Sequence, residues 1–145
     1  MAKVDMANNI APVVNILFAE YTATKTPAAG VDLQGYESCA FIITTGTITD
    51  GTWTVTFQES DEAAANFVTI DPTADGYNGQ LVGTVPGPFT NVANAFDDKI
   101  YKVGYVGPKQ YVRCVVTMTV MGTSEFGVAA ILGDPHSAPV SVGFA

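Results

Sequence analysis

Few residues in this sequence have the types and spacing that catalysis or metal binding requires. His136 is the single histidine, and it lies between Pro135 and Pro139 near the end of the chain. Cys39 and Cys114 are the two cysteines, too few to make a zinc tetrad with that histidine. Neither a Gly-x-Ser-x-Gly elbow nor a His-Glu-x-x-His motif occurs. The sequence therefore predicts no enzymatic activity, catalytic residue, metal site or cofactor, with His136 as a solvated tail residue.

Acidic residues cluster at three places, which raises the alternatives of calcium binding and glycoside hydrolysis. A calcium loop needs alternating Asp or Asn ligands and a closing Glu, and residues 71–76 lack them. A glycosidase needs two carboxylates across a cleft, which one sequence cannot place. Asp is also a preferred turn residue, because its side chain bonds to nearby backbone. We interpret the clustered carboxylates as solvated turn residues: Glu59, Asp61, Glu62, Asp71, Asp75, Asp97 and Asp98.

Aromatic residues offer two further kinds of contact, sugar stacking and a protein interface. Trp53 shares one face of an alternating run with Val55, which predicts a core position, although a sugar platform is the alternative. Several tyrosines start or line predicted strands, and a phenol suits a surface that is part apolar and part wet. We predict a protein-contact face at Tyr101, Tyr105 and Tyr111, with ordinary strand positions as the alternative.

Length and charge limit the remaining classes. The chain has 145 residues, a common size for one domain, and 48% are hydrophobic while 14% are charged. The formal charge of −8 argues against a nucleic-acid partner. The longest uncharged stretch, residues 76–96, is interrupted by Gly and Pro, so no membrane partner is expected. Residues 1–10 lack the apolar core of a signal peptide, and we expect folding in the cytoplasm with Cys39 and Cys114 as free thiols.

Residue composition indicates a β protein. Val, Thr and Ile supply 43 of the 145 residues, whereas Leu appears 4 times. Strict alternation in residues 52–58 predicts a strand with one buried face. The turn Thr49–Thr52 predicts a hairpin, and residues 61–66 predict at most one helical turn. We predict about eight strands, at residues 12–19, 36–45, 52–59, 66–70, 79–85, 100–106, 110–120 and 125–132.

Short separations between these strands predict antiparallel pairing and a two-layer arrangement. The expected fold class is all-β, an antiparallel two-sheet β-sandwich with jelly-roll-like winding. We expect an N-terminal arm at residues 1–11, the sandwich domain at 12–133 and an extended C-terminal arm at 134–145. The C-terminal arm has two prolines and isolated apolar residues, which favours docking on a neighbour, with a frayed end as the alternative. Its candidate contact residues are Pro135, Pro139, Val140, Val142 and Phe144.

Five segments, taken in order, carry a resemblance to a known family. They are Val31-Asp-Leu-Gln-Gly-Tyr36, Gly46-Thr-Ile-Thr-Asp-Gly-Thr52, Phe57-Gln-Glu-Ser-Asp61, Val103-Gly-Tyr-Val-Gly-Pro-Lys-Gln-Tyr-Val-Arg113 and Leu132-Gly-Asp-Pro-His-Ser-Ala-Pro-Val140. In this order and at these separations the chain resembles small virion proteins of tailed bacteriophages. That group is encoded among head genes and includes capsid cement, or decoration, proteins. The resemblance covers about residues 31–61 and 100–140, and none of the five segments is a chemical motif.

The resemblance implies a β-sandwich or jelly-roll fold and a structural role. It implies a protein on the outer surface of an icosahedral capsid that contacts the major capsid protein and copies of itself, as a dimer or trimer, and cements the shell. Low charge suits such contacts, because weakly charged surface loses little hydration when it is buried. No contact residue is transferred, since the family has no defined binding motif. A tail or head-to-tail joining component is one alternative, and a carbohydrate-binding module that uses Trp53 and exposed tyrosines is another.

Overall fold

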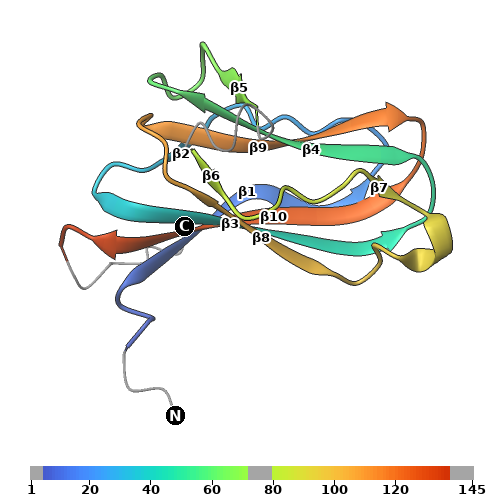
Figure 1. Ribbon diagram of the computed structural model, residues 1–145, viewed down its shortest axis with the longest axis horizontal. Coiled ribbons are helices and arrows are strands. Elements are labelled where there is room, and N and C mark those ends of the chain that lie inside the picture. The colour runs from blue at the N-terminus through green and yellow to red at the C-terminus, as the bar shows by residue number, and fades with distance from the viewer. Residues whose placement is uncertain (1–4, 72–79, 138–145) are drawn as a thin grey trace.

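The computed structural model describes residues 5–71 and 80–137. Within them, ten strands form two antiparallel sheets packed face to face, so the predicted all-β two-sheet sandwich is confirmed (Figure 1). The first sheet has the order β1, β10, β3, β8, β6, and the second has the order β2, β9, β4, β5, with β7 also paired to β4. The strands are β1 (Ile10–Tyr21), β2 (Val31–Asp32), β3 (Tyr36–Ile48), β4 (Thr52–Ser60), β5 (Val68–Ile70), β6 (Leu81–Val82), β7 (Phe89–Thr90), β8 (Ile100–Tyr105), β9 (Tyr111–Val120) and β10 (Ser124–Pro135).

The core lies between the two sheets and is built from the inward side of each strand. Trp53 and Phe57 point inward from β4, as the alternation predicted. They meet aromatic residues of the first sheet: the Phe41 ring lies 5.2 Å from that of Phe57, and the Phe126 ring lies 5.4 Å from that of Trp53. Both cysteines are buried as free thiols, also as predicted. Burial of these large side chains stabilises the fold by about 1.5–3 kcal/mol each.

Most connections carry the chain from one sheet to the other. Among the described strands, β4 and β5 are the only consecutive pair that hydrogen-bond to each other. The predicted hairpin at Thr49–Thr52 is wrong, because β3 and β4 lie in different sheets. The N–H groups of Thr49 and Asp50 both donate to the Thr123 carbonyl at 3.1 Å, so this turn packs on the β9–β10 loop. A tight turn between alternating runs has the same sequence signature whether it joins two strands of one sheet or connects one sheet to the other.

Strand pairing is nested around the β4–β5 hairpin. β3 pairs with β8, β2 with β9 and β1 with β10, so earlier strands meet later ones in reverse order. Two more pairings, β10 with β3 and β9 with β4, join these pairs into the two sheets. The nested pairs therefore alternate between the two sheets, and the short strands β6 and β7 pair with β8 and β4 respectively.

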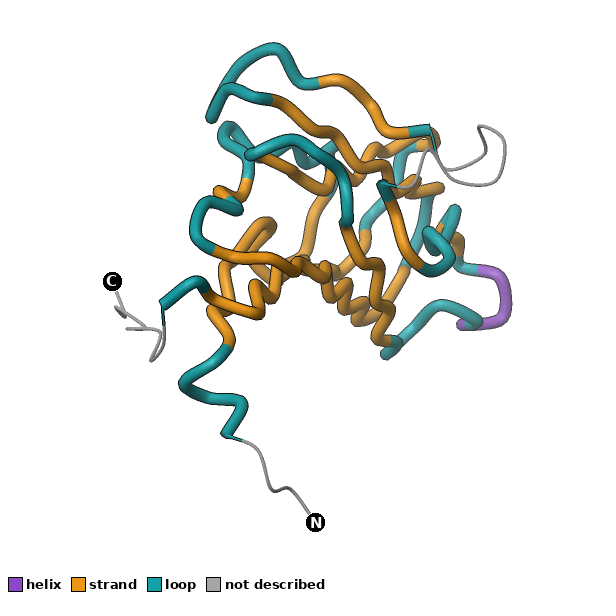
Figure 2. The backbone as a smooth tube through the Cα atoms, turned by 60° about the vertical axis from the view of Figure 1, so that its left-hand side comes forward, coloured by secondary structure: helices purple, strands orange, loops and turns teal. Residues whose placement is uncertain are grey.

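The segment between β1 and β2 closes one side of the sandwich. Lys25 pairs with Val116 of β9 through backbone hydrogen bonds of 2.8 and 3.0 Å. The Asn15 side-chain oxygen accepts the Cys114 N–H at 3.0 Å, which ties β1 in the first sheet to β9 in the second. Backbone groups of Cys114 and Val116 on β9 therefore have partners from this part of the chain. The two layers and the loops that join them are visible in Figure 2.

Residues 61–66 form a loop without a helical turn, which agrees with the prediction of at most one. The Ser60 hydroxyl donates to the Ala65 carbonyl at 2.6 Å and accepts the Glu62 N–H at 3.0 Å, so one side chain holds the loop closed. Such bonds give the backbone an alternative to helical pairing. A short 3-10 turn occurs elsewhere, at Val92–Asn94.

The sandwich extends into both predicted arms. β1 begins at Ile10, inside the predicted N-terminal arm, and β10 ends at Pro135, inside the predicted C-terminal arm. Residues 5–9 lead away from the layers as turns (Figure 2). A membrane-crossing helix would have to be long and apolar, and the described segments include none.

Candidate functional site

The three tyrosines predicted as a contact face do not share one. Tyr101 and Tyr105 point inward from β8, on the side of the buried Val103, and Tyr105 is 3% exposed. Tyr111 belongs to β9 in the other sheet, where it flanks the buried Val112. The prediction of a shared tyrosine face is therefore wrong. The physical reason is the two-residue period of a strand, which sends Tyr101 and Tyr105 to the core side together with Val103.

The predicted C-terminal contact residues are only partly within the described chain. Pro135 is the last residue of β10 and pairs with the start of β3, so it belongs to the sandwich and not to an arm. Pro139, Val140, Val142 and Phe144 lie outside the described residues. Their part in docking stays a prediction.

His136 is exposed, as predicted, but it has partners. Its Nε2 atom contacts Oε1 of Glu37, and the backbone N–H of His136 donates to the Gly35 carbonyl at 2.9 Å. Within the described segments Glu37 is the one side chain bonded to this imidazole. These contacts fix the position at which the chain leaves β10.

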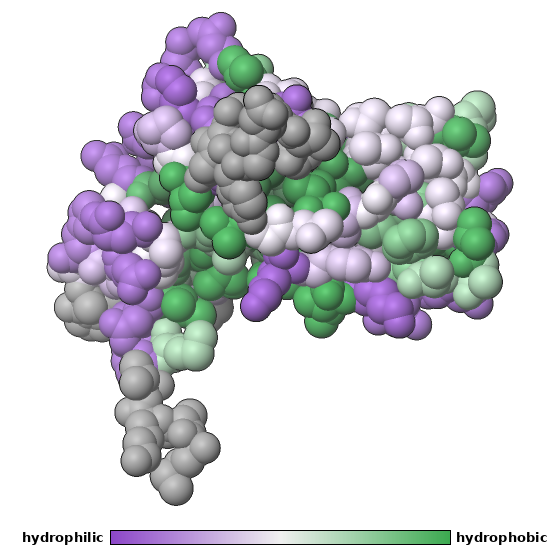
Figure 3. Space-filling view, viewed as in Figure 1, coloured by the Kyte–Doolittle hydropathy of each residue, from purple (hydrophilic) through white to green (hydrophobic). Residues whose placement is uncertain are grey.

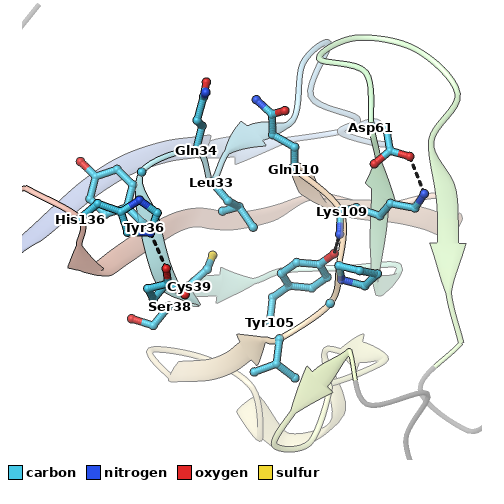
Figure 4. Close-up of a pocket in the computed structure, with 15 residues that line it drawn as sticks. Leu33, Gln34, Tyr36, Ser38, Cys39, Asp61, Tyr105, Lys109, Gln110 and His136 are labelled. Carbon is cyan, nitrogen blue, oxygen red and sulfur yellow. Dashed lines mark hydrogen bonds and ion pairs between the residues drawn. The ribbon is translucent and has the colours of Figure 1, made fainter.

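His136 lines an open groove of about 710 Å³ at one end of the sandwich (Figure 4). The groove is formed by the loop after β2, the start of β3 and the β8–β9 loop. Leu33, Tyr36 and Pro108 supply apolar lining, while Lys109 forms an ion pair with a carboxylate of the β4–β5 loop. Hydrophilic side chains gather at this end of the molecule in the space-filling view (Figure 3).

Glu59 is a buried carboxylate next to the groove, so its interpretation as a solvated turn residue is wrong. Tyr105 Oη on β8 donates to Glu59 Oε2 at 2.6 Å, and Gln80 Nε2 donates to Oε1 at 2.7 Å. The Tyr105 oxygen also accepts the Lys109 N–H at 3.1 Å. Because Glu59 lies on β4, these bonds join the two sheets. Both carboxylate oxygens have a donor, as a buried charge requires.

The groups beside the groove bind one another and are not poised to react. Burial, followed by the hydrogen bond to Glu59, raises the pKa of Tyr105 above its usual range, so the phenol is protonated at neutral pH. Burial raises the pKa of Cys39 to about 12, so its thiol is also protonated and a poor nucleophile. The hydrogen bond that Lys109 Nζ donates to Asp61 raises the pKa of Lys109, which keeps that amine charged. The described residues contain no group of three or more His, Cys, Asp or Glu that could hold a metal ion.

The outer face of the first sheet is the stronger candidate for function, because large apolar side chains are exposed together on it. Leu17 is 67% exposed, Phe18 is 51% exposed, and Val14 is also exposed. Beside them lies a shallow hollow of about 390 Å³ that contains Ile42 and Ala129. We call this surface the apolar face: Val14, Leu17, Phe18, Ile42 and Ala129.

The outer face of the second sheet has a different character. Its β4 positions between core residues are Thr52, Thr54 and Thr56, and Arg113 of β9 donates to the side chain of Gln58 at 2.9 Å. Hydroxyl and amide groups hydrate well, so these β4 and β9 positions suit association less than apolar side chains do. The contrast between the two sheets singles out the apolar face as a surface for association.

Sequence reasoning missed the apolar face. The signal was a break in alternation, since Ile16, Leu17 and Phe18 are consecutive large apolar residues in a run read as one regular strand. Two register shifts in β1 are the structural cause. A β-bulge re-aims side chains in this way, and bulges occur mostly at sheet edges.

Trp53 is fully buried, as the alternation predicted, and its Nε1 atom donates to the Asp50 carbonyl at 3.1 Å. A sugar platform needs an exposed ring face, so the carbohydrate-binding alternative that uses Trp53 is wrong for this residue.

Comparison with known proteins finds no matching family model, no matching curated protein and no matching solved structure. The resemblance to phage virion proteins is therefore a prediction from sequence segments alone. What this chain does must be inferred from its own residues and geometry.

Proposed function

We propose that this chain is a structural virion protein that binds the outer surface of a tailed-phage icosahedral capsid and stabilises the shell. The observation that carries the proposal is the apolar face, where Val14, Leu17 and Phe18 are exposed together on the outside of the first sheet beside a shallow apolar hollow. Exposed apolar surface of this kind is typical of protein association sites. Its partners are the major capsid protein and copies of this chain.

A cementing protein must be stiff, and the winding of this chain supplies stiffness. We infer a jelly roll from the nested pairing of β1 with β10, β2 with β9, β3 with β8 and β4 with β5. In this winding eight strands form two packed sheets, and it recurs in viral capsid domains. Cross-sheet bonds at Asn15 and Glu59 support the same conclusion, because each ties one layer to the other.

The proposed role is structural and not enzymatic. Cys39 and Tyr105 have raised pKa values and are protonated at neutral pH, and Lys109 is occupied by Asp61. A nucleophile needs a lowered pKa or an adjacent base. We therefore interpret the groove as the end of the sandwich, where polar side chains bond to one another, and not as an active site.

Charge favours the outside of a phage head. The formal charge of −8 opposes contact with packaged DNA, whereas the outer shell presents no such barrier. The C-terminal residues Pro139, Val140, Val142 and Phe144 remain candidates for docking on a capsid neighbour. Extended apolar segments of this kind bind by burial and by adding backbone hydrogen bonds to a sheet edge.

Counting the copies of this chain in purified virions tests the proposal. Quantitative mass spectrometry with isotope-labelled peptides from this chain and from the major capsid protein gives their ratio. We expect a ratio that corresponds to icosahedral occupancy, with hundreds of copies per head. Copies sufficient for one ring would favour the head-to-tail joining alternative, and absence from virions would contradict a structural role in the particle. Peptides from a host cytoplasmic protein serve as the contamination control.

A further inference from the structure

The apolar face contains a ridge made by a bulge in β1. Ile16 pairs with Val128 and Ala19 pairs with Phe126, so Leu17 and Phe18 together oppose the single residue Gly127. Because two residues of β1 lie opposite one residue of β10, the strand bulges and both side chains lie on its outer side, which explains their exposure. The Tyr21 hydroxyl donates to the Leu17 carbonyl at 2.6 Å and holds the bulge in place.

Gly127 makes the bulge possible and leaves a hollow beside it. A Cβ atom at position 127 would lie 2.7 Å from Phe18 Cα, closer than any side chain tolerates. The Phe18 backbone therefore sits directly over a residue with no side chain. Leu17 and Phe18 form one wall of the hollow of about 390 Å³, whose lining also includes Val14, Ile42 and Ala129. A projecting pair of side chains and a recess of similar chemistry thus lie side by side on one surface.

The electrostatics of this surface suit a second acidic molecule. No charged residue is among those that line the hollow, although the chain carries a formal charge of −8. Two such chains repel each other at long range, so they can approach closely only through an uncharged patch. Charged side chains border the hollow: Glu20 and Glu125 face each other across β1 and β10 next to the ridge, and Lys102 of β8 pairs with Ile42 of β3.

The outer face of the first sheet comes close to the area that a dimer needs. β1, β10 and β3 have 12, 12 and 13 residues. With a rise of about 3.3 Å per residue and a spacing of about 4.8 Å between strands, these three strands and β8 cover on the order of 650 Å² in plan. A stable interface buries about 800 Å² per partner, and projecting side chains add to the plan area.

We infer that two copies of this chain associate face to face through the apolar face, with Leu17 and Phe18 of each copy seated in the hollow of the other. A ridge beside a matching hollow is self-complementary, which is what a two-fold interface requires. This inference rests on the proposed structural role and names the partner of the apolar face. This contact supplies the self-association of the proposed assembly, and the candidates for binding the major capsid protein are the C-terminal residues Pro139, Val140, Val142 and Phe144.

Sedimentation equilibrium of the full chain tests the dimer, with Leu17→Asp and Val68→Asp as a matched pair. Leu17 is 67% exposed on the first sheet, and Val68 is 66% exposed on the second, so neither change disturbs the core. We expect a wild-type dimer, a dimer dissociation constant raised at least about tenfold by Leu17→Asp, and no change from Val68→Asp. Added salt should tighten the dimer, because it screens repulsion between two acidic chains.

A cross-linking experiment tests the ridge-in-hollow geometry. Chains carrying Leu17→Cys and chains carrying Ile42→Cys are mixed and oxidised, and we expect a mixed disulfide that forms faster than with Val68→Cys chains. The native thiols are buried and provide the background rate.

A monomer at all concentrations and salt conditions would overturn the dimer, as would equal weakening by Leu17→Asp and Val68→Asp. A trimer would do the same, because a face-to-face two-fold contact closes at two copies. A monomer that is still found at icosahedral copy number in virions would contradict the dimer and leave the proposed function standing. A dimer that is absent from virions would contradict the proposed function and leave the dimer standing.

Discussion

Tyr105→Phe removes one hydroxyl group and should destabilise the whole sandwich. In the wild type this hydroxyl donates to Glu59 at 2.6 Å and accepts the Lys109 N–H at 3.1 Å, and Tyr105 is 3% exposed. A hydrogen bond to a charged group contributes about 1.5–3 kcal/mol, and an unpaired backbone N–H adds to the loss. We expect the free energy of unfolding to fall by about 2–4 kcal/mol. For a chain of this size the Tm should drop by about 6–12 °C.

Urea denaturation followed by tryptophan fluorescence measures this change, because the single tryptophan, Trp53, is fully buried in the folded state. Tyr111→Phe is the control, since that hydroxyl accepts one bond from Gln110 at 3.1 Å on a half-buried side chain. We expect the control to stay within about 0.5 kcal/mol of the wild type. Adding Glu59→Gln to the wild type and to Tyr105→Phe completes a double-mutant cycle, which gives the coupling energy between Tyr105 and Glu59. A Tyr105→Phe variant as stable as the control would refute the cross-sheet bridge.

Three further perturbations have defined outcomes. Burial raises the pKa of Cys39 from 9.0 to about 12, so folding favours the protonated thiol. The stability that this preference gives is complete below pH 9 and is lost as the pH rises toward 12. The free energy of unfolding should therefore fall between pH 7 and pH 10 by about 1.4 kcal/mol more in the wild type than in Cys39→Ala. Gly127→Ala should lower stability by about 1–3 kcal/mol, because the new Cβ meets the Phe18 backbone, and thermal melts that match the wild type would contradict the bulge geometry. Truncation after Ser137 removes residues 138–145 but leaves β10 intact, so Tm should be unchanged while cosedimentation with capsids weakens; equal cosedimentation would refute the docking arm.

The sequence predicted the layers better than their connections. Alternation in β4 and β9 is local, and it identified Trp53, Phe57 and Cys114 as core residues because a strand needs no distant partner to define its inward side. Pairing depends on residues far apart in the chain, so the Thr49–Thr52 turn was read as a hairpin although β3 and β4 lie in different sheets. Strands of two residues, such as β2 and β7, are too short to show any period.

The functional surface was less predictable than the core. Tyr105 continues the inward positions of β8, and Glu59 continues those of β4, so period alone could have placed both inside. A tyrosine and a carboxylate were assigned to the surface because their types usually occur there. The apolar face depends on a bulge that opposes Leu17 and Phe18 to Gly127, and such a register shift follows from contact between strands distant in sequence.

The central claim is that this chain strengthens a shell by binding it, and heads that lack the chain test this most directly. Purified protein is added to such heads in increasing amounts, and the temperature at which they release DNA is measured, with Leu17→Asp and Val68→Asp protein in parallel. We expect a saturable rise in that temperature with wild type and Val68→Asp protein, and a smaller rise with Leu17→Asp. An unchanged release temperature at full occupancy, or no binding at all, would contradict the account.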